Sequence, residues 1–482
     1  MLYKISNIIH NKCNGDKMKY IDLILKLFED NSDLVVRKIK RNFKTTYVLF
    51  LSTLSSSDLI NKYIMKNLTI PNFKFKNIRG IIGAPNLKEI SFSEVELHMC
   101  SGYTIIIENN IIFALETKVS FDRSIDRAQV EPSLYGPKDS FIENYQKNIG
   151  LIKKRIKSHH LKTKDFVLGR YSKTNIGLLY IDNIVKPDLV NDVTKRLNSI
   201  NTEAITTSGE LKQFLANENK NVFPAIKLSE RPDTIVRALL SGKIVILVDT
   251  SPFAIILPSV LADYINPTDD YFTNSINTNF LKFLRIFCFI ITIITPALYI
   301  AITNFNQESI PAKFLMNIST QRFGVPFPSI IEALIMLFVC ELLRESDLRF
   351  PNSYGSAISI LGALIIGESA VASGIVSPIM IIIIALTFLS CLIFNEVEIT
   401  GAIRAWRFIF LLFAAFLGLY GVALCTLLII INLCSYKSFN LTYMFPLSPF
   451  DLSYLKETLI KTKRKKNNYR SKYLTDNIRK QI

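Results

Sequence analysis

Residues 358–394 read ISILGALIIGESAVASGIVSPIMIIIIALTFLSCLIF, and Glu368 is the single side chain among them that carries a formal charge. The stretch is too long and too apolar for a surface helix, since about 20 apolar residues cross a bilayer once. Ser377 and Pro378 lie near its middle, and a proline removes a backbone donor and ends the helix before it. The stretch therefore predicts two membrane-spanning helices, at 358–377 and 379–394.

The two predicted helices differ in side-chain size. The first carries many small residues, among them Gly362, Gly367 and Gly374, and the second carries the isoleucine run 381–384. Small residues let helix backbones approach one another in lipid. We therefore expect the first helix to face protein and the second to face lipid.

Glu368 is the candidate functional residue of this stretch, with Ala372 and Ile375 near the same helix face as further candidate pore-lining residues. A charged carboxylate within a bilayer is costly unless it meets water or a partner. One hypothesis is that copies of Glu368 ring a cation path in an oligomer. The alternative is a protonated or hydrogen-bonded glutamate that only packs.

Other apolar runs extend the predicted membrane region over residues 281–435. One span is expected at 283–303 and the last at 406–434, where Trp406 and Arg407 would act as interface anchors. The run 330–343 is short and carries Glu332 and Glu341, so it is interpreted as re-entrant, interfacial or packed inside the assembly. The sequence predicts four full crossings besides this segment, an arrangement that places Arg404 and Arg407 on the outer side.

The charge balance favours a membrane protein with a cytoplasmic tail. The 482 residues include 57 Lys and Arg and 40 Asp and Glu, for a formal charge of +17. A basic cluster at 461–466 follows the last apolar run, which predicts a basic cytoplasmic tail over 436–482. Nucleic-acid binding is disfavoured. The N-terminus lacks the apolar core of a signal peptide, so the N-terminal half is also expected to be cytoplasmic.

Residues 1–120 predict an N-terminal α/β subdomain. Strands are expected at 34–39 and 46–51, a helix at 59–68, and a hairpin from 103–107 and 111–115. Residues 121–137 carry two prolines and a glycine and are interpreted as a hinge.

Residues 138–280 predict a second α/β subdomain. A helix is expected at 138–157, followed by strands at 166–168, 176–181, 243–249 and 253–257 and a helix at 187–200. The basic residues at the end of the first helix, from Lys153 to Lys157, are interpreted as a solvated helix end that complements the helix dipole. A contact with phosphate or lipid is the alternative.

No catalytic or metal motif stands out, so neither an enzyme nor a cofactor is expected. There is no Walker loop, dinucleotide fingerprint, zinc-protease motif or nucleophile elbow. The seven cysteines show no metal spacing, and the adjacent His159 and His160 follow a basic helix. The segment Ser229-Glu-Arg-Pro-Asp233 is interpreted as a salt-bridge and capping cluster, with a ligand site as the alternative.

Several motifs together resemble the A subunit of bacterial spore germinant receptors, the GerA family. They include VEPSLYGPKDSFIE at 130–143, NIGLIKKRI at 148–156, ERPD at 230–233, DTSPF at 249–253, LLRE at 342–345, GALIIGESAV at 362–371 and GIVSP at 374–378. The resemblance covers about residues 125–450. Tyr135, Ser140 and Ser229 depart from the residues that the family usually has at these positions.

The resemblance implies a subunit of the spore inner membrane that forms an oligomeric, nutrient-gated ion channel. It also implies three partners: further copies of the chain, a transporter-like B subunit and a lipoprotein C subunit. A transporter-like or scaffolding subunit without its own pore is the alternative. Eleven motif residues become candidates for coupling or structural roles: Glu131, Pro132, Gly136, Pro137, Glu143, Glu230, Arg231, Pro232, Asp233, Arg344 and Glu345.

Overall fold

The computed structural model describes residues 20–41, 44–69, 82, 84, 86–108, 111–119, 128, 130–133, 135–216, 221–349, 367–394, 396–452, 455, 458, 460, 470 and 472–477. The chain forms two compact units. The sheet unit comprises Met1–Asn217, Ile226–Pro258 and Tyr469–Gln481, and the helical unit comprises Glu218–Ala225, Ser259–Asn468 and Ile482. The predicted basic cluster at 461–466 lies outside the described residues.

The first sheet of the sheet unit has five antiparallel strands, in the order β1-β2-β4-β5-β3. They are β1 (Leu34–Arg41), β2 (Lys44–Leu51), β3 (Lys88–Glu89), β4 (Tyr103–Glu108) and β5 (Ile111–Glu116). The strands predicted at 34–39 and 46–51 and the predicted hairpin are confirmed. The hairpin register pairs Tyr103 with Glu116 and Glu108 with Ile111.

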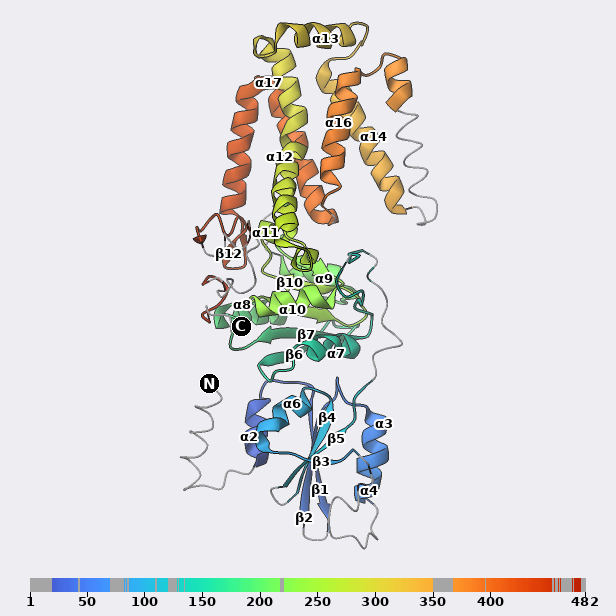
Figure 1. Ribbon diagram of the computed structural model, residues 1–482, viewed down its shortest axis with the longest axis vertical. Coiled ribbons are helices and arrows are strands. Elements are labelled where there is room, and N and C mark those ends of the chain that lie inside the picture. The colour runs from blue at the N-terminus through green and yellow to red at the C-terminus, as the bar shows by residue number, and fades with distance from the viewer. Residues whose placement is uncertain are drawn as a thin grey trace. The chain divides into compact units, whose positions relative to one another are not determined.

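Alternate side chains of this sheet pack on opposite faces, as the two-residue period of a strand requires. Leu49 and Ile105 face α2 (Tyr20–Leu27) and α6 (Val95–Met99), which η2 (Phe92–Glu94) precedes. Val48 and Ile106 face α3 (Ser57–Ile60), η1 (Asn61–Met65) and α4 (Lys66–Thr69). The helices therefore cover both faces of the sheet (Figure 1).

The second sheet repeats the strand order of the first. Its five antiparallel strands are arranged as β6-β7-β9-β10-β8, which is again first, second, fourth, fifth and third in chain order. They are β6 (Leu161–Leu168), β7 (Thr174–Ile181), β8 (Lys227–Ser229), β9 (Ile244–Val248) and β10 (Ala254–Leu257). Every residue of β9 is buried, because helices cover both faces here too.

The helices of the second sheet are α7 (Tyr145–Arg155), α8 (Pro187–Ser199), α9 (Ser208–Leu215) and α10 (Pro232–Leu240). The helix predicted at 138–157 begins seven residues late, at Tyr145, because the Asn144 side chain caps it and accepts from the Lys147 backbone N–H. Apolar residues of α2, α6, α7 and α10 and of both sheets belong to one buried cluster, so the two sheets form a single unit.

The helical unit consists of short elements followed by long apolar helices. It begins with α11 (Leu261–Ile265) and η3 (Thr268–Tyr271) and continues with α12 (Ser275–Phe305), η4 (Gln307–Ser309), α13 (Ala312–Arg322), α14 (Ser329–Arg349), α16 (Pro378–Cys391) and α17 (Val397–Ser435). Residues 367–372 are also helical, and the small strands β11 (Lys437–Ser438) and β12 (Leu441–Thr442) follow α17. We call the two ends of this bundle the Ser275 end and the Phe305 end, after the bounds of α12.

Two apolar segments belong to helices that are longer than their predicted bounds. The run predicted at 330–343 belongs to α14, whose 21 residues reach about 31 Å at 1.5 Å per residue. The span predicted at 406–434 belongs to α17, whose 39 residues are two helices that meet at Gly418. Much of the segment predicted as the span 358–377 lies outside the described residues.

The chain reverses at Gly418. This residue has a φ of +59°, and a Cβ built on it would lie 2.9 Å from Phe305 at the far end of α12. Three residues later, a Cβ on Gly421 would lie 2.2 Å from the carbonyl oxygen of Phe413, which places the two arms of α17 side by side. Both Val397 and Ser435 therefore lie at the Ser275 end (Figure 1).

Large apolar side chains remain exposed along the long helices. Examples are Phe283 at 70% exposure, Phe416 at 79% and Ile431 at 62%. Among the described residues, α12 and α17 are each long and apolar enough to cross a membrane, and α16 is a shorter apolar helix.

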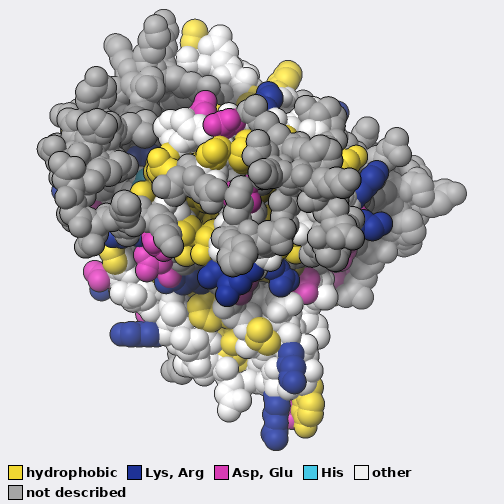
Figure 2. Space-filling view, turned by 90° about the horizontal axis from the view of Figure 1, so that it is seen from below, with side chains coloured by type: hydrophobic (Ala, Val, Ile, Leu, Met, Phe, Trp, Pro, Cys, Tyr) yellow, Lys and Arg dark blue, Asp and Glu magenta, His cyan; other side chains and the backbone are white. Residues whose placement is uncertain are grey.

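Figure 2 shows charged side chains of both signs among the described residues on one face of the molecule. Lys and Arg side chains of the described residues lie in several separate places there, with Asp and Glu side chains between them.

Candidate functional site

The first cluster joins two motifs that lie about 100 residues apart in the sequence. The Glu230 carboxylate accepts hydrogen bonds from the backbone N–H groups of Val130 and Glu131, at 2.6 and 2.7 Å. The Ser229 hydroxyl donates to the Glu131 carboxylate at 2.5 Å. Residues 130–131 of the predicted hinge are therefore fastened to the end of strand β8.

The same motif also starts helix α10. Pro232 occupies its first turn, and Arg231 forms two hydrogen bonds with Asp233, at 3.1 and 2.8 Å. Both side chains of this pair are more than nine-tenths buried. A buried ion pair needs such geometry to offset its desolvation. The salt-bridge and capping cluster predicted for 229–233 is present.

The remaining motif residues of the hinge lie in the turns that follow. The Gly136 backbone N–H donates to the Ser133 hydroxyl at 2.7 Å. The Glu143 carbonyl oxygen accepts from the Thr250 backbone N–H at 3.0 Å. Pro132 and Pro137 belong to the same non-helical segment before α7. This segment therefore contacts the DTSPF motif as well as the ERPD motif.

A second cluster joins the two sheets of the sheet unit. The Lys153 ammonium lies 2.6 Å from the Asp33 carboxylate, which also accepts from the Thr53 hydroxyl at 2.5 Å. Both charged side chains are at most 6% exposed. The interpretation of Lys153 as part of a solvated helix end was wrong, although Lys154 and Lys157 beside it are exposed.

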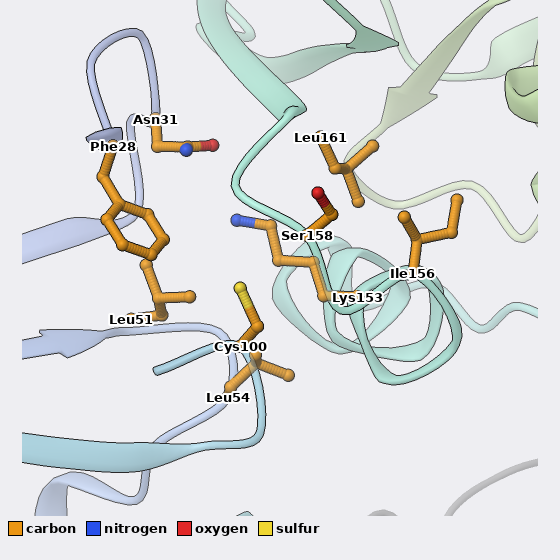
Figure 3. A pocket seen from close by; sticks show the side chains of 9 residues that line it. All are labelled: Phe28, Asn31, Leu51, Leu54, Cys100, Lys153, Ile156, Ser158 and Leu161. Atoms are coloured by element: carbon orange, nitrogen blue, oxygen red, sulfur yellow. The ribbon is translucent and has the colours of Figure 1, made fainter. Parts of the chain in front are cut away.

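A small void lies beside this ion pair (Figure 3). Its volume is about 10 Å³, about that of one water site, and Cys100, Lys153 and Asn31 contribute to its lining. Burial raises the pKa of the Cys100 thiol to about 12, so this cysteine stays protonated and unreactive at neutral pH. The void is a packing feature of the joint between the sheets.

His159 takes part in the same joint, and His160 beside it pairs within the second sheet's part of the chain. His159 Nδ1 lies 2.7 Å from the Glu96 carboxylate, and His160 Nδ1 lies 2.8 Å from that of Asp182. The hydrogen bond from His159 lowers the pKa of the Glu96 carboxyl. Each histidine therefore has a carboxylate partner, and no group of three or more metal-ligand side chains occurs in the part of the chain that the structure describes.

The helical unit contains a buried acid for which the sequence predicted no separate role. Glu332, in the first turn of α14, is fully buried, and its carboxylate accepts from the backbone N–H and the hydroxyl of Ser377, at 2.9 and 2.8 Å. Arg322 of α13 lies 3.7 Å from the other carboxylate oxygen. Glu332 therefore caps the start of α16 and fixes it to α13 and α14. The sequence signal that could have indicated this role is a charged residue inside an otherwise apolar run.

Arg344 lies near the end of α14, at the Ser275 end of the bundle, where it is half-buried, and Glu345 beside it is exposed. Arg407 is not the interface anchor that the sequence predicted. Its side chain is only 3% exposed and lies 3.7 Å from the Glu341 carboxylate, which also pairs with Arg404. The three arginines, which come from two helices, therefore gather at one end of the bundle.

Glu368 and its two neighbours lie toward the Phe305 end. Glu368 and Ala372 belong to the helical residues 367–372 and are exposed, and Ile375, in the turn that follows, is 41% exposed. That turn approaches Gly324, because a Cβ on Gly374 would lie 3.7 Å from the Gly324 carbonyl oxygen. All three candidate pore-lining residues are thus accessible on a single copy of the chain.

Comparisons with known proteins agree with these motifs. The family model of the Bacillus/Clostridium GerA spore germination protein matches residues 22–473, which extends beyond the resemblance at both ends. Spore germination protein KA of Bacillus subtilis (strain 168) is 33% identical over 448 residues, 89% of this chain and 81% of that protein. Spore germination protein GerLA of Bacillus cereus is 32% identical over 454 residues, 92% of each chain.

Among solved structures, a similar one is the crystal structure of the N-terminal domain of the A subunit of the Bacillus megaterium spore germinant receptor GerK3. It is 23% identical with a TM-score of 0.39, and the match covers 50% of this chain and 94% of that one.

Proposed function

The chain belongs to the GerA family of Bacillus/Clostridium spore germination proteins, as a germinant-receptor A subunit, and from this premise we propose that it forms an oligomeric, nutrient-gated cation channel in the spore inner membrane. The observation that carries the proposal is the pair of long apolar helices, α12 and α17, with large apolar side chains exposed along them. Exposed apolar surface of this extent needs lipid or protein to cover it.

The proposed topology has six crossings. The helix α12, the helices α14 and α16, and the two arms of α17 each run between the Ser275 end and the Phe305 end (Figure 1). The sixth crossing is the span predicted at 358–377, much of which lies outside the described residues. This count replaces the predicted four crossings and places the segments before α12 and after α17 on one side.

We assign the Ser275 end to the cytoplasm. Basic residues concentrate on the cytoplasmic side of membrane proteins. The basic residues toward this end include Lys282, Arg285, Arg344, Arg404 and Arg407, whereas Lys313 and Arg322 lie toward the Phe305 end. Four crossings would place Arg404 and Arg407 on the outer side, away from the tail. With the reversal at Gly418, both arginines lie on the same side as the tail.

We place the cation path at the contact between copies, with Glu368, Ala372 and Ile375 facing it. Their exposure on the single chain is what such a role requires, and a ring of carboxylates attracts cations. Under the same proposal, the hinge clamp of Glu131, Glu230, Arg231 and Asp233 transmits movement of the sheet unit, and the receptor's B and C subunits are partners.

The test is cation flux through the assembled receptor carrying Glu368→Gln. Removal of the ring of charges should lower cation conductance about tenfold or more, while assembly and membrane insertion stay intact. Glu308→Gln is the matched control, since Glu308 is an exposed acid in η4 near the same end of the bundle. Normal flux in Glu368→Gln would remove the pore role and favour a scaffolding or transporter-like subunit.

A further inference from the structure

A cavity of about 210 Å³ opens at the Ser275 end of the helical unit. The end of α14, the end of α16 and the start of α17 enclose it, and Glu341, Arg344, Arg404 and Arg407 are its charged lining residues. Water takes about 30 Å³ per molecule in the liquid, so the space suits a small oxyanion with some of its hydration.

The charges around the cavity do not balance. Three arginines against one glutamate leave a formal excess of two positive charges. Arg404 pairs with the Glu341 carboxylate, but Arg407 Nη2 lies 3.7 Å from it, beyond hydrogen-bond distance. The single carboxylate is therefore largely engaged by Arg404, and the remaining positive charge faces the cavity.

Arg407 is the most deeply buried of the three arginines, and its ion pair with Glu341 is long, at 3.7 Å. Its residue exposure is 2%, and its Nε has no hydrogen-bond partner among the described residues. Arginine stays charged even when buried, and a buried donor without an acceptor is destabilising. A bound anion would satisfy both the charge and the free donor.

We propose that this cavity binds the phosphate group of a ligand, held by Arg344, Arg404 and Arg407. The guanidinium fork matches phosphate oxygens in paired hydrogen bonds, and arginine is enriched where such recognition occurs. A phosphodiester headgroup carries one negative charge and inorganic phosphate one to two near neutral pH, so either group would reduce the excess of two positive charges.

The surroundings favour a phospholipid headgroup over a free phosphate. Leu392 and Val397 line the same cavity and are 54% and 57% exposed, and Leu389, one turn earlier on α16, is 62% exposed. Apolar side chains beside a phosphate site give an acyl chain a surface to follow. Binding of a phospholipid rests on the membrane location proposed above, whereas binding of a free phosphate does not.

The experiment uses the full chain purified in detergent and measures binding by native mass spectrometry and by the shift in melting temperature. The probes are phosphatidylglycerol, inorganic phosphate, and an uncharged diacylglycerol with the same acyl chains. We expect phosphatidylglycerol to bind and diacylglycerol not to bind. Inorganic phosphate that displaces the lipid identifies the phosphate group as the recognised part, and phosphate binding without lipid binding identifies a soluble ligand.

The variants separate site binding from general charge. Arg407→Gln should weaken phosphatidylglycerol binding about tenfold or more, since a charge-assisted hydrogen bond is lost. Arg407→Lys should recover part of it. Arg344→Gln carries the test should Arg407→Gln fail to fold, because Arg344 is only half-buried. Lys313→Gln, an exposed charge on α13, is the control.

Binding that is equal in Arg344→Gln, Arg407→Gln and the parent chain would overturn the proposal, and so would equal losses in Lys313→Gln. If the chain binds neither phosphatidylglycerol nor phosphate but conducts cations normally, the channel proposal stands and the phosphate site is rejected. Phosphate binding by a chain that does not insert into bilayers would sustain this site and reject the channel.

Discussion

At the scale of single residues, the sequence predicted polar clusters of neighbouring residues better than it predicted ion pairs between residues far apart in the sequence. The group at 229–233 was interpreted as a salt-bridge and capping cluster, and Arg231 and Asp233 do form a buried pair. Lys153 was misinterpreted because its partner, Asp33, lies 120 residues earlier, and no local pattern relates the two positions. The roles of Glu332 and Arg407 were not predicted for the same reason, since they depend on which helices become neighbours.

The Lys153–Asp33 pair is expected to hold the two sheets together. Lys153→Met should lower the free energy of opening of β6 by about 3–5 kcal/mol, because it leaves a buried carboxylate uncompensated. Hydrogen exchange of the β6 amides in the full chain measures this. Lys154→Met, at the exposed neighbouring position, should change it by less than about 0.5 kcal/mol.

Asp33→Asn combined with Lys153→Met provides the cross-check. The double variant buries no unpaired charge, so it should recover part of the loss. A Lys153→Met chain that exchanges at the parent rate would show that the pair contributes nothing to the joint.

At the scale of elements, strands and helix starts followed from local chemistry. Short runs rich in β-branched and aromatic residues predicted β1, β2, β4 and β5, and Pro187 and Pro378 mark the first turns of α8 and α16. The helix α7 was predicted too long because helical spacing continues into residues that the structure has in an extended segment. The reversal inside α17 was missed because both arms are equally apolar, although a run of that length exceeds the roughly 20 residues of one span.

Gly418 is expected to be indispensable for that reversal. Its ψ of −141° at a φ of +59° is a conformation that essentially only glycine adopts, and an added Cβ would lie 2.9 Å from Phe305. Gly418→Ala should destabilise the helical unit by about 1–3 kcal/mol and lower the melting temperature of the detergent-solubilised chain.

Gly401→Ala in the same element is the control for Gly418→Ala. Gly401 does not have a positive φ, and the nearest atom to an added Cβ is 3.7 Å away. Its melting temperature should stay unchanged or rise slightly, since alanine favours a helix by about 1 kcal/mol. Equal melting temperatures for both variants would contradict the assignment of strain to Gly418.

At the scale of the whole molecule, composition and apolar runs predicted an α/β half followed by a helical half, and both are present. The repeated strand order of the two sheets was beyond reach of the sequence. The two sheets share the order in which their strands are connected, and no sequence motif marks that order. Packing details are particular to one sheet: in the second sheet, Tyr145 fills the space beside Gly177 of β7.

The proposed six crossings make a direct prediction about sidedness. With an impermeant maleimide outside sealed vesicles of cytoplasm-in orientation, Gln321→Cys on α13 should be labelled and Glu398→Cys on α17 should be protected. The unsubstituted chain gives the background from its native cysteines. Labelling of Glu398→Cys from outside would restore the four-crossing arrangement, in which residues near 400 lie on the outer side.

The last described residues of the chain return to the sheet unit. Arg470 Nε donates to the Leu240 carbonyl oxygen at 2.9 Å, Asn477 donates to that of Asn183 at 3.3 Å, and Leu474 packs over Gly242. These residues are synthesised after every long apolar helix of the chain. The contacts at the end of α10 are therefore completed only after α17 has been synthesised, and until then the Leu240 carbonyl oxygen lacks its bond from Arg470.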